Sequence, residues 1–298
     1  MPKFISGENF ILVKERTSRK GDKAICVIRS SGYTIDEKAV TEPWILTQLR
    51  TVPKKDRSHL PDPAIANQTG NILKPYEEKD CNVYGLYAKP ECKGIKELQN
   101  ELAQFIKENI VNNYEKHALI GHSKGALIFA GLPLDIHTNI LLIAPTFGTI
   151  MGNEELMIKT LDEYKRSKNI IQKALLTPDI ALYKWVMRTI GSRRPIDYDM
   201  SINSDFILKE LDLSYLSYHR TMLITATCPR GIFISPTDAF FRHYGKYLGL
   251  DQQADGMVEL EKQKLCQSLV NEVITIKATH PTVLGKVEPE IQRFLRGI

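Results

Sequence analysis

The sequence predicts an α/β protein with a mostly parallel central sheet, helices on both faces and an inserted helical segment. Short apolar runs typical of buried strands alternate with segments of helical periodicity over most of the chain. That alternation stops between 151 and 218, where the pattern reads as helices alone. We therefore predict a core formed by 1–150 and 219–298, with 151–218 inserted as a helical lid.

Composition supports one sizeable folded core. The chain has 298 residues, of which 43% are hydrophobic and 25% charged, which is ordinary globular usage. Its net charge of +5 is spread without a long run of like charges, so we expect no nucleic-acid binding. The five cysteines are irregularly spaced and form no CxxC pair, which favours free thiols over a zinc site.

No targeting or membrane signal stands out. Met1 to Phe10 lack the basic and apolar regions of a signal peptide, and no apolar stretch approaches about 18 residues. We therefore expect a cytoplasmic protein with no membrane span, and the sequence leaves its oligomeric state open.

The first half of the chain divides into two strand and helix units. A strand at 24–28 enters a small-residue loop, and a helix is expected over 37–49. Four prolines make 51–79 a long loop. A strand at 82–88 then precedes a helix whose apolar residues recur from 95 to 110.

The next unit contains the most informative motif. A short strand at 118–120 runs directly into Gly121-His122-Ser123-Lys124-Gly125, and a buried helix continues over 126–130. A further strand at 139–144 follows and ends at Pro145.

In the inserted segment, Met157, Leu161 and Tyr164 share one helical face, which serves either for packing or as a wall for an acyl group. The cations Lys165, Arg166 and Lys168 are interpreted as a solvated face. Strands are expected again at 231–235 and 273–277, and a closing helix at 287–295.

Ser123 is the candidate nucleophile. A sharp strand-to-helix turn that exposes a serine requires small residues two positions away on each side, and Gly121 and Gly125 supply them. The amide of Lys124 would stabilise a developing oxyanion, and the amide of Tyr33 is the first choice for a second donor. The Lys124 side chain either attracts an anionic substrate or is solvated or paired.

A serine needs a base, usually a histidine that a carboxylate orients. His280 and Asp238 each follow a predicted strand, and they give the chain order serine, aspartate, histidine. The alternatives are a capping role for His280 and a helix N-cap role for Asp238. His243 lies within a predicted helix, and His122 is expected to point away from Ser123.

These residues resemble the α/β-hydrolase superfamily: the elbow from Gly121 to Gly125, the acid loop Ser235-Pro236-Thr237-Asp238, and a C-terminal His280. The resemblance implies an eight-stranded, mostly parallel sheet with a lid after the sixth strand. It also implies Ser123 as nucleophile, His280 as base, Asp238 as acid, and the Lys124 and Tyr33 amides as oxyanion donors. The interval 280 − 238 = 42 residues is long for this family, so we interpret Leu248 to Lys264 as an insertion.

The expected function is that of a serine hydrolase of the esterase, lipase or thioesterase type, acting on a small-molecule acyl substrate through an acyl-enzyme on Ser123. No metal or organic cofactor is expected. Two alternatives stay open: a hydrolase of another bond, such as a peptidase or carbon–carbon hydrolase, and a non-catalytic binding protein on the same fold.

Overall fold

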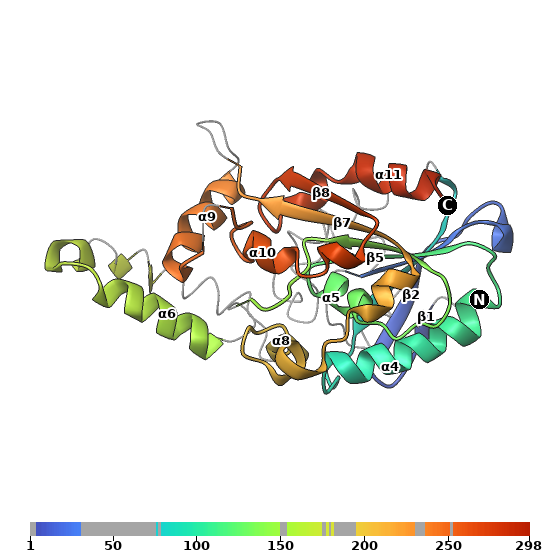
Figure 1. The fold of residues 1–298 in the computed structure, drawn as a ribbon, viewed down its shortest axis with the longest axis horizontal. Helices are drawn as coiled ribbons and strands as arrows, with labels where there is room; N and C mark the ends of the chain where they lie inside the picture. The colour runs from blue at the N-terminus through green and yellow to red at the C-terminus, as the bar shows by residue number, and fades with distance from the viewer. Residues whose placement is uncertain are drawn as a thin grey trace, which may run out of the picture.

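The computed structural model contains an eight-stranded sheet whose strands follow the order β1-β2-β4-β3-β5-β6-β7-β8 (Figure 1). The structure describes residues 4–30, 76, 79–149, 154–174, 177–178, 180–181, 195–229, 236–250 and 253–298. The strands are β1 (Phe4–Ser6), β2 (Phe10–Arg16), β3 (Cys26–Ser30), β4 (Asn82–Ala88), β5 (His117–His122), β6 (Asn139–Ile143), β7 (Arg220–Thr227) and β8 (Glu272–Lys277). The β1–β2 and β2–β4 pairs are antiparallel and the other five are parallel, which confirms the predicted mostly parallel sheet.

The α-helices and the shorter helical turns connect these strands. In the described parts of the chain the named α-helices are α4 (Ile95–Phe105), α5 (Lys124–Ala130), α6 (Glu154–Arg166), α8 (Pro195–Tyr198), α9 (Pro236–Gly245), α10 (Leu260–Gln263) and α11 (Glu288–Arg296). The 3-10 and π turns are η1 (Gly21–Lys23), η3 (Ile106–Val111), η5 (Phe206–Glu210), η6 (Ser214–Tyr218), η7 (Lys246–Leu248), η8 (Gln267–Leu269) and η9 (Val283–Gly285).

Alternating side chains of the strands supply two cores, one on each face of the sheet. On one face, Ile28 and Leu119 pack with the apolar sides of α4 and α5. On the other face, Val27 and Ile120 belong to the cluster that contains the apolar side of α11. Helices α4 and α5 therefore cover one side of the sheet and α11 the other, as Figure 1 shows. This sandwich holds the carboxyl ends of the parallel strands at one common edge.

The predicted inserted segment divides in two. Helix α6 buries Met157 and Leu161 against Tyr247 and Leu248 of η7, so its apolar face is used for packing. The later part of the segment instead joins the main core, through Ile196, Phe206 and Leu216. A bridge between Thr149 and Ser201 further ties that part to the loop after β6.

Three strands were not anticipated. Strands β1 and β2 add an antiparallel edge to the sheet. Strand β7 is buried, but its threonines interrupt the apolar run that would have revealed it. Those hydroxyls are satisfied locally, since Thr221 lies 3.3 Å from the Asn271 side chain and Thr225 lies 2.9 Å from the Thr275 hydroxyl. The strand predicted at 231–235 and the helix at 37–49 lie outside the described residues.

All five cysteines are free thiols. In the parts of the chain that the structure describes, no helix is both long enough and apolar enough to cross a membrane.

A buried histidine directly before β7 predicts that the protein is less stable in acid. His219 is 4% exposed, and burial lowers its pKa to about 4, with a further contribution from His137 and His117. Neither ring nitrogen has a hydrogen-bond partner among the described residues. The unfolded chain binds the proton near pH 6.5 and the folded chain only near pH 4, so the folded state loses stability as the pH falls through that window.

We expect His219→Leu to weaken the dependence of the free energy of unfolding on pH between 7 and 4. Urea unfolding at several pH values in this range should show that the free energy of unfolding of the wild type falls by on the order of 1 kcal/mol more than that of the variant. Parallel profiles for the two proteins would contradict a neutral, buried His219.

Candidate active site

The turn between β5 and α5 exposes Ser123 at the carboxyl edge of the sheet. Ser123 has φ 57° and ψ −125°, a backbone conformation that residues with a Cβ rarely adopt. Its amide donates to the carbonyl of Ile143 at 3.0 Å, which holds the turn against β6. The strained residue is thus the one that carries the hydroxyl.

Gly121 and Gly125 make this turn possible. A Cβ on Gly121 would lie 2.5 Å from the carbonyl oxygen of Gly125. A Cβ on Gly125 would lie 2.2 Å from the carbonyl oxygen of Ser30, at the end of β3. Both separations are far below a normal carbon–oxygen contact, so the close approach of strand, turn and helix requires glycine at both positions.

Gly125→Ala is therefore expected to lower the free energy of unfolding by about 1 to 3 kcal/mol or more, because backbone atoms must shift to admit the methyl group. Urea denaturation measures this loss. Gly285→Ala is the matched control, because nothing lies within 4 Å of its added Cβ. Equal stability of the two variants would contradict the packing described for the turn.

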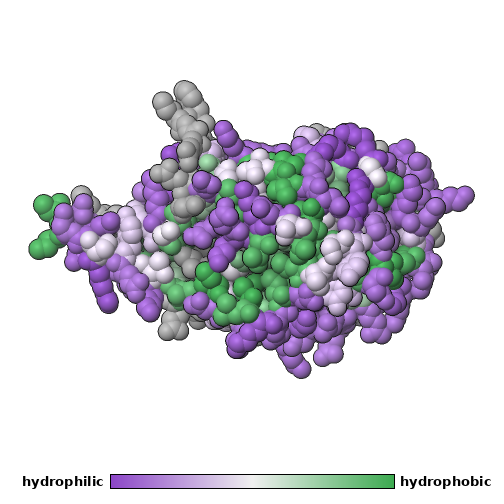
Figure 2. Space-filling view, viewed as in Figure 1, coloured by the Kyte–Doolittle hydropathy of each residue, from purple (hydrophilic) through white to green (hydrophobic). Residues whose placement is uncertain are grey.

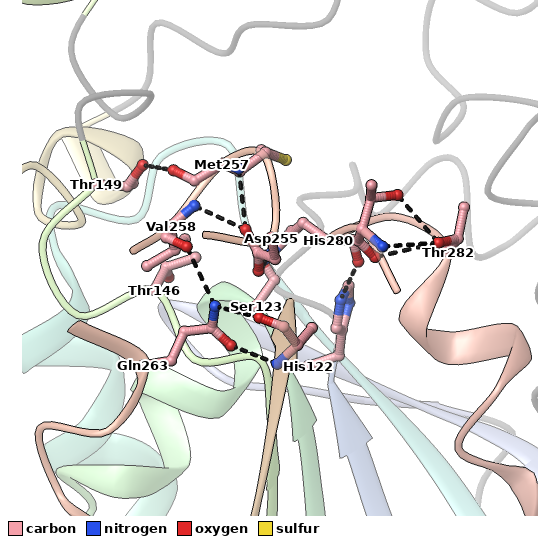
Figure 3. A network of polar contacts seen from close by, with 12 residues as sticks. His122, Ser123, Thr146, Thr149, Asp255, Met257, Val258, Gln263, His280 and Thr282 are labelled. Atoms are coloured by element: carbon pink, nitrogen blue, oxygen red, sulfur yellow. Dashed lines mark hydrogen bonds and ion pairs between the residues drawn. The ribbon is translucent and has the colours of Figure 1, made fainter. Parts of the chain in front are cut away.

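His280 reaches Ser123 from the loop after β8. Its Nε2 lies 2.7 Å from Oγ of Ser123, within hydrogen-bond distance. His280 is 3% exposed. In Figure 3 His280 lies close to Ser123 and to Asp255, and its Nδ1 is within hydrogen-bond distance of a carboxylate. The structure thus brings together the predicted nucleophile and the predicted base.

The carboxylate beside His280 is that of Asp255, not Asp238. Oδ2 of Asp255 lies 2.7 Å from Nδ1 of His280, and the His280 amide donates to the Asp255 carbonyl at 2.9 Å. Asp255 is fully buried. Asp255 lies within 248–264, the segment interpreted from the sequence as an insertion, although Asp255-Gly256 is a turn signal only 280 − 255 = 25 residues before the histidine.

Asp238 has a different position, near the amino end of α9. Its Oδ1 accepts hydrogen bonds from the amide and hydroxyl of Thr279, at 3.2 and 2.6 Å, and from the hydroxyl of Thr282 at 2.6 Å. Lys286 lies 4.0 Å from its other oxygen. This carboxylate therefore holds the turn that carries His280, and the prediction that it lies against the imidazole is corrected.

The loop that carries Asp255 is tightly restrained. Oδ1 of Asp255 accepts the amides of Met257 and Val258, at 2.9 and 2.7 Å. Gly256, between Asp255 and Met257, has φ 90° and leaves no room for a Cβ against Phe241. One oxygen of the Asp255 carboxylate therefore stabilises the loop, and the other is within hydrogen-bond distance of His280.

Two further side chains fix this loop, one to β7 and one to the loop after β6. The fully buried amide of Gln263 donates to the carbonyls of Ala226 and Val258 and accepts the Ala226 amide at 2.7 Å. The Thr149 hydroxyl donates to the Met257 carbonyl at 2.9 Å. Figure 3 shows these bonds around the loop that carries Asp255. A rigid support of this kind sets the direction of the Asp255 carboxylate.

His122 packs against the base without contacting the serine hydroxyl. Its ring centroid lies 5.1 Å from that of His280, and its Nε2 lies 3.2 Å from the His280 carbonyl. Burial, together with the neighbouring His280, lowers the pKa of His122 to about 3. A neutral His122 can therefore donate Nε2–H to that carbonyl. His243 bonds the Tyr247 hydroxyl at 3.0 Å instead.

Lys124 is the first residue of α5, directly after Ser123. Its ammonium forms a buried ion pair with Asp197 of α8. The alternative in which this lysine is paired is therefore the observed one. Tyr33, the expected second oxyanion donor, lies outside the described residues.

No group of three or more His, Cys, Asp or Glu side chains suited to a metal ion occurs within the described ranges. The absence of a cofactor stays a prediction.

One comparison with a solved structure supports this architecture. No family model and no curated protein sequence matches the chain. Among solved structures, a Bacillus licheniformis lipase matches with a TM-score of 0.53 at 13% identity, over 96% of this chain and 97% of that one. An epoxide hydrolase from Bacillus megaterium matches with a TM-score of 0.48 at 11% identity, over 98% and 99% of the two chains.

The strand order, the elbow after β5 and the similarity to the lipase structure define the fold. This chain has the α/β-hydrolase fold. At such low identity the similarity concerns the fold alone, so the chemistry has to be argued from the site.

Proposed function

We propose that the protein is a serine hydrolase that cleaves a carboxylic ester or thioester through an acyl-enzyme on Ser123. The observation that carries the proposal is the pair of 2.7 Å contacts of His280, one to Oγ of Ser123 and one to Oδ2 of Asp255. A serine, a histidine and a carboxylate in this order form the arrangement that activates a hydroxyl for acyl transfer.

Asp255 sets the tautomer of the base. A carboxylate beside Nδ1 favours the proton on that nitrogen, which leaves the lone pair of Nε2 directed at the Ser123 hydroxyl. When His280 becomes positively charged, the same carboxylate stabilises the charge. The bonds from Met257 and Val258 keep Asp255 in place throughout.

In the acylation step, Oγ of Ser123 attacks the acyl carbon while Nε2 of His280 takes its proton. The oxyanion forms near the amide of Lys124, with Tyr33 as the expected second donor. Collapse of the tetrahedral intermediate breaks the bond to the leaving group, and His280 returns the proton to the departing oxygen or sulfur. The products are an alcohol or thiol and the acyl-enzyme.

Deacylation reverses these roles. His280 takes a proton from water, and the resulting hydroxide attacks the acyl carbon. The second tetrahedral intermediate then releases Ser123, which regains its proton from His280, and the carboxylic acid leaves.

A panel of chromogenic substrates tests the bond class. Matched nitrophenyl esters, acyl thioesters and anilides of the same acyl group should give kcat/KM values for ester and thioester that exceed the anilide value at least about a hundredfold. Comparable rates on the anilides would instead indicate a peptidase. Absence of turnover on the whole panel by folded protein would favour a non-catalytic binding protein.

A further inference from the structure

The arm formed by α6 and the turn after it ends in an exposed apolar pair. Ile170 is 84% exposed and Ile171 is 73% exposed, which places both among the most exposed of the large hydrophobic side chains described. Figure 1 shows the arm extending beyond the sheet, at the end of the molecule away from both termini. Large exposed apolar side chains on a protruding element commonly mark an interaction site.

The exposed pair lies on an ordered turn. The Gln172 amide donates to Oδ1 of Asn169 at 2.9 Å, and the Asn169 amide donates to Oε1 of Gln172 at 3.4 Å. This reciprocal pair is a capping box, which starts a new helical turn at Ile170 and Ile171. These hydrogen bonds fix the backbone of the turn, and both isoleucines on it are exposed to solvent.

The base of the arm is fixed to the body. Met157 and Leu161 are buried against η7, and Tyr164 packs at the edge of the same cluster. Lys168 lies over the Tyr164 ring at 4.3 Å, which joins the turn to the end of α6. The arm consequently holds its tip away from the sheet.

The charge of the tip is entirely positive. From 164 to 174 the chain carries four cations, Lys165, Arg166, Lys168 and Lys173, and no carboxylate. Figure 2 shows hydrophobic atoms at this end of the molecule beside strongly hydrophilic ones. An anionic partner with an apolar interior complements such a tip.

We propose that this tip, residues 164–174, docks the protein onto anionic phospholipid membranes. Two isoleucines are too small a surface for a stable protein interface, which buries roughly 800 Å² per partner. Insertion into a bilayer surface needs only a few apolar side chains, supported by the attraction between anionic headgroups and each nearby Lys or Arg. The four cations lie at the headgroup level and the isoleucines enter below it.

Co-sedimentation with vesicles tests the proposal on the full chain. Wild-type protein should bind phosphatidylcholine vesicles that contain roughly one-third phosphatidylglycerol, and should bind pure phosphatidylcholine at least about tenfold more weakly. Binding should fall in high salt, because the contact between lipid headgroups and cations is exposed to screening.

Two double variants separate the apolar contribution to membrane binding from the electrostatic one. Ile170→Ser combined with Ile171→Ser should weaken binding about tenfold, and so should Arg166→Gln combined with Lys173→Gln. Leu208→Ser is the matched control, since Leu208 is 63% exposed beside Lys209 but lies on η5. Thermal unfolding confirms that each variant is folded.

Loss of binding in both tip variants but not in Leu208→Ser would support the docking surface. Wild-type protein that does not bind anionic vesicles at low salt would overturn it, as would tip variants that bind like the wild type. Tip variants that only convert a dimer to a monomer, measured by light scattering, would assign the tip to a second copy of the chain. These readouts need no hydrolysis, so they are independent of the proposed function.

Discussion

Asp255→Asn is expected to lower kcat for ester hydrolysis by about a thousandfold to ten-thousandfold, whereas Asp238→Asn lowers it by less than about tenfold. The amide at position 255 is neutral, so it cannot stabilise the imidazolium. Its NH2 group would donate to Nδ1 of His280, which places the ring proton on Nε2 and gives the base the wrong tautomer. The amide introduced by Asp238→Asn would keep an oxygen acceptor for Thr279 and Thr282, so the turn before His280 should persist.

Steady-state kinetics of the two purified variants on one nitrophenyl ester decide between the carboxylates. Near-ultraviolet circular dichroism and urea unfolding serve as controls for folding. A large loss in Asp238→Asn with little change in Asp255→Asn would contradict the arrangement described for His280.

Asp197→Leu is expected to destabilise the protein by about 3 to 5 kcal/mol, because it leaves the Lys124 ammonium buried without its partner. Both side chains are less than a tenth exposed, and Oδ2 of Asp197 has no hydrogen-bond partner among the described residues. The ion pair therefore joins α8 to Lys124, the residue after the nucleophile. Its formation requires that both charged groups lose most of their contact with water, which costs free energy.

The double variant Lys124→Met with Asp197→Leu is the control for this loss. Removal of both charges should restore most of the stability, since an apolar pair of similar volume carries no desolvation penalty. Urea unfolding of the two single variants and the double variant measures the coupling. A double variant as unstable as the sum of the singles would show that the ion pair contributes nothing.

The part of the site built from consecutive residues was predictable. The strand, the elbow and the helix around Ser123 are adjacent in the chain, so the apolar runs and the two glycines sufficed to locate them. His280 follows the last strand directly, and its position required only that β8 be recognised.

The acid was not predictable in the same way. Three aspartates, Asp238, Asp251 and Asp255, lie between β7 and β8, and only the path of that connection decides which one meets the histidine. The path depends on contacts between distant residues, such as those of Gln263 with Ala226 and of Thr149 with Met257. Strand β7 was not predicted for a related reason. Its threonines can be buried only because Asn271, just before β8, and Thr275, within β8, bond their hydroxyls, and these partners are distant in the sequence.

The most direct test of the proposed chemistry is labelling with a fluorophosphonate probe, followed by peptide mass spectrometry to locate the adduct. We expect one adduct on Ser123, lost in Ser123→Ala together with ester turnover and formed much more slowly in His280→Gln. Folded wild-type protein that takes up no probe, or that carries the adduct on another residue, would contradict Ser123 as the nucleophile.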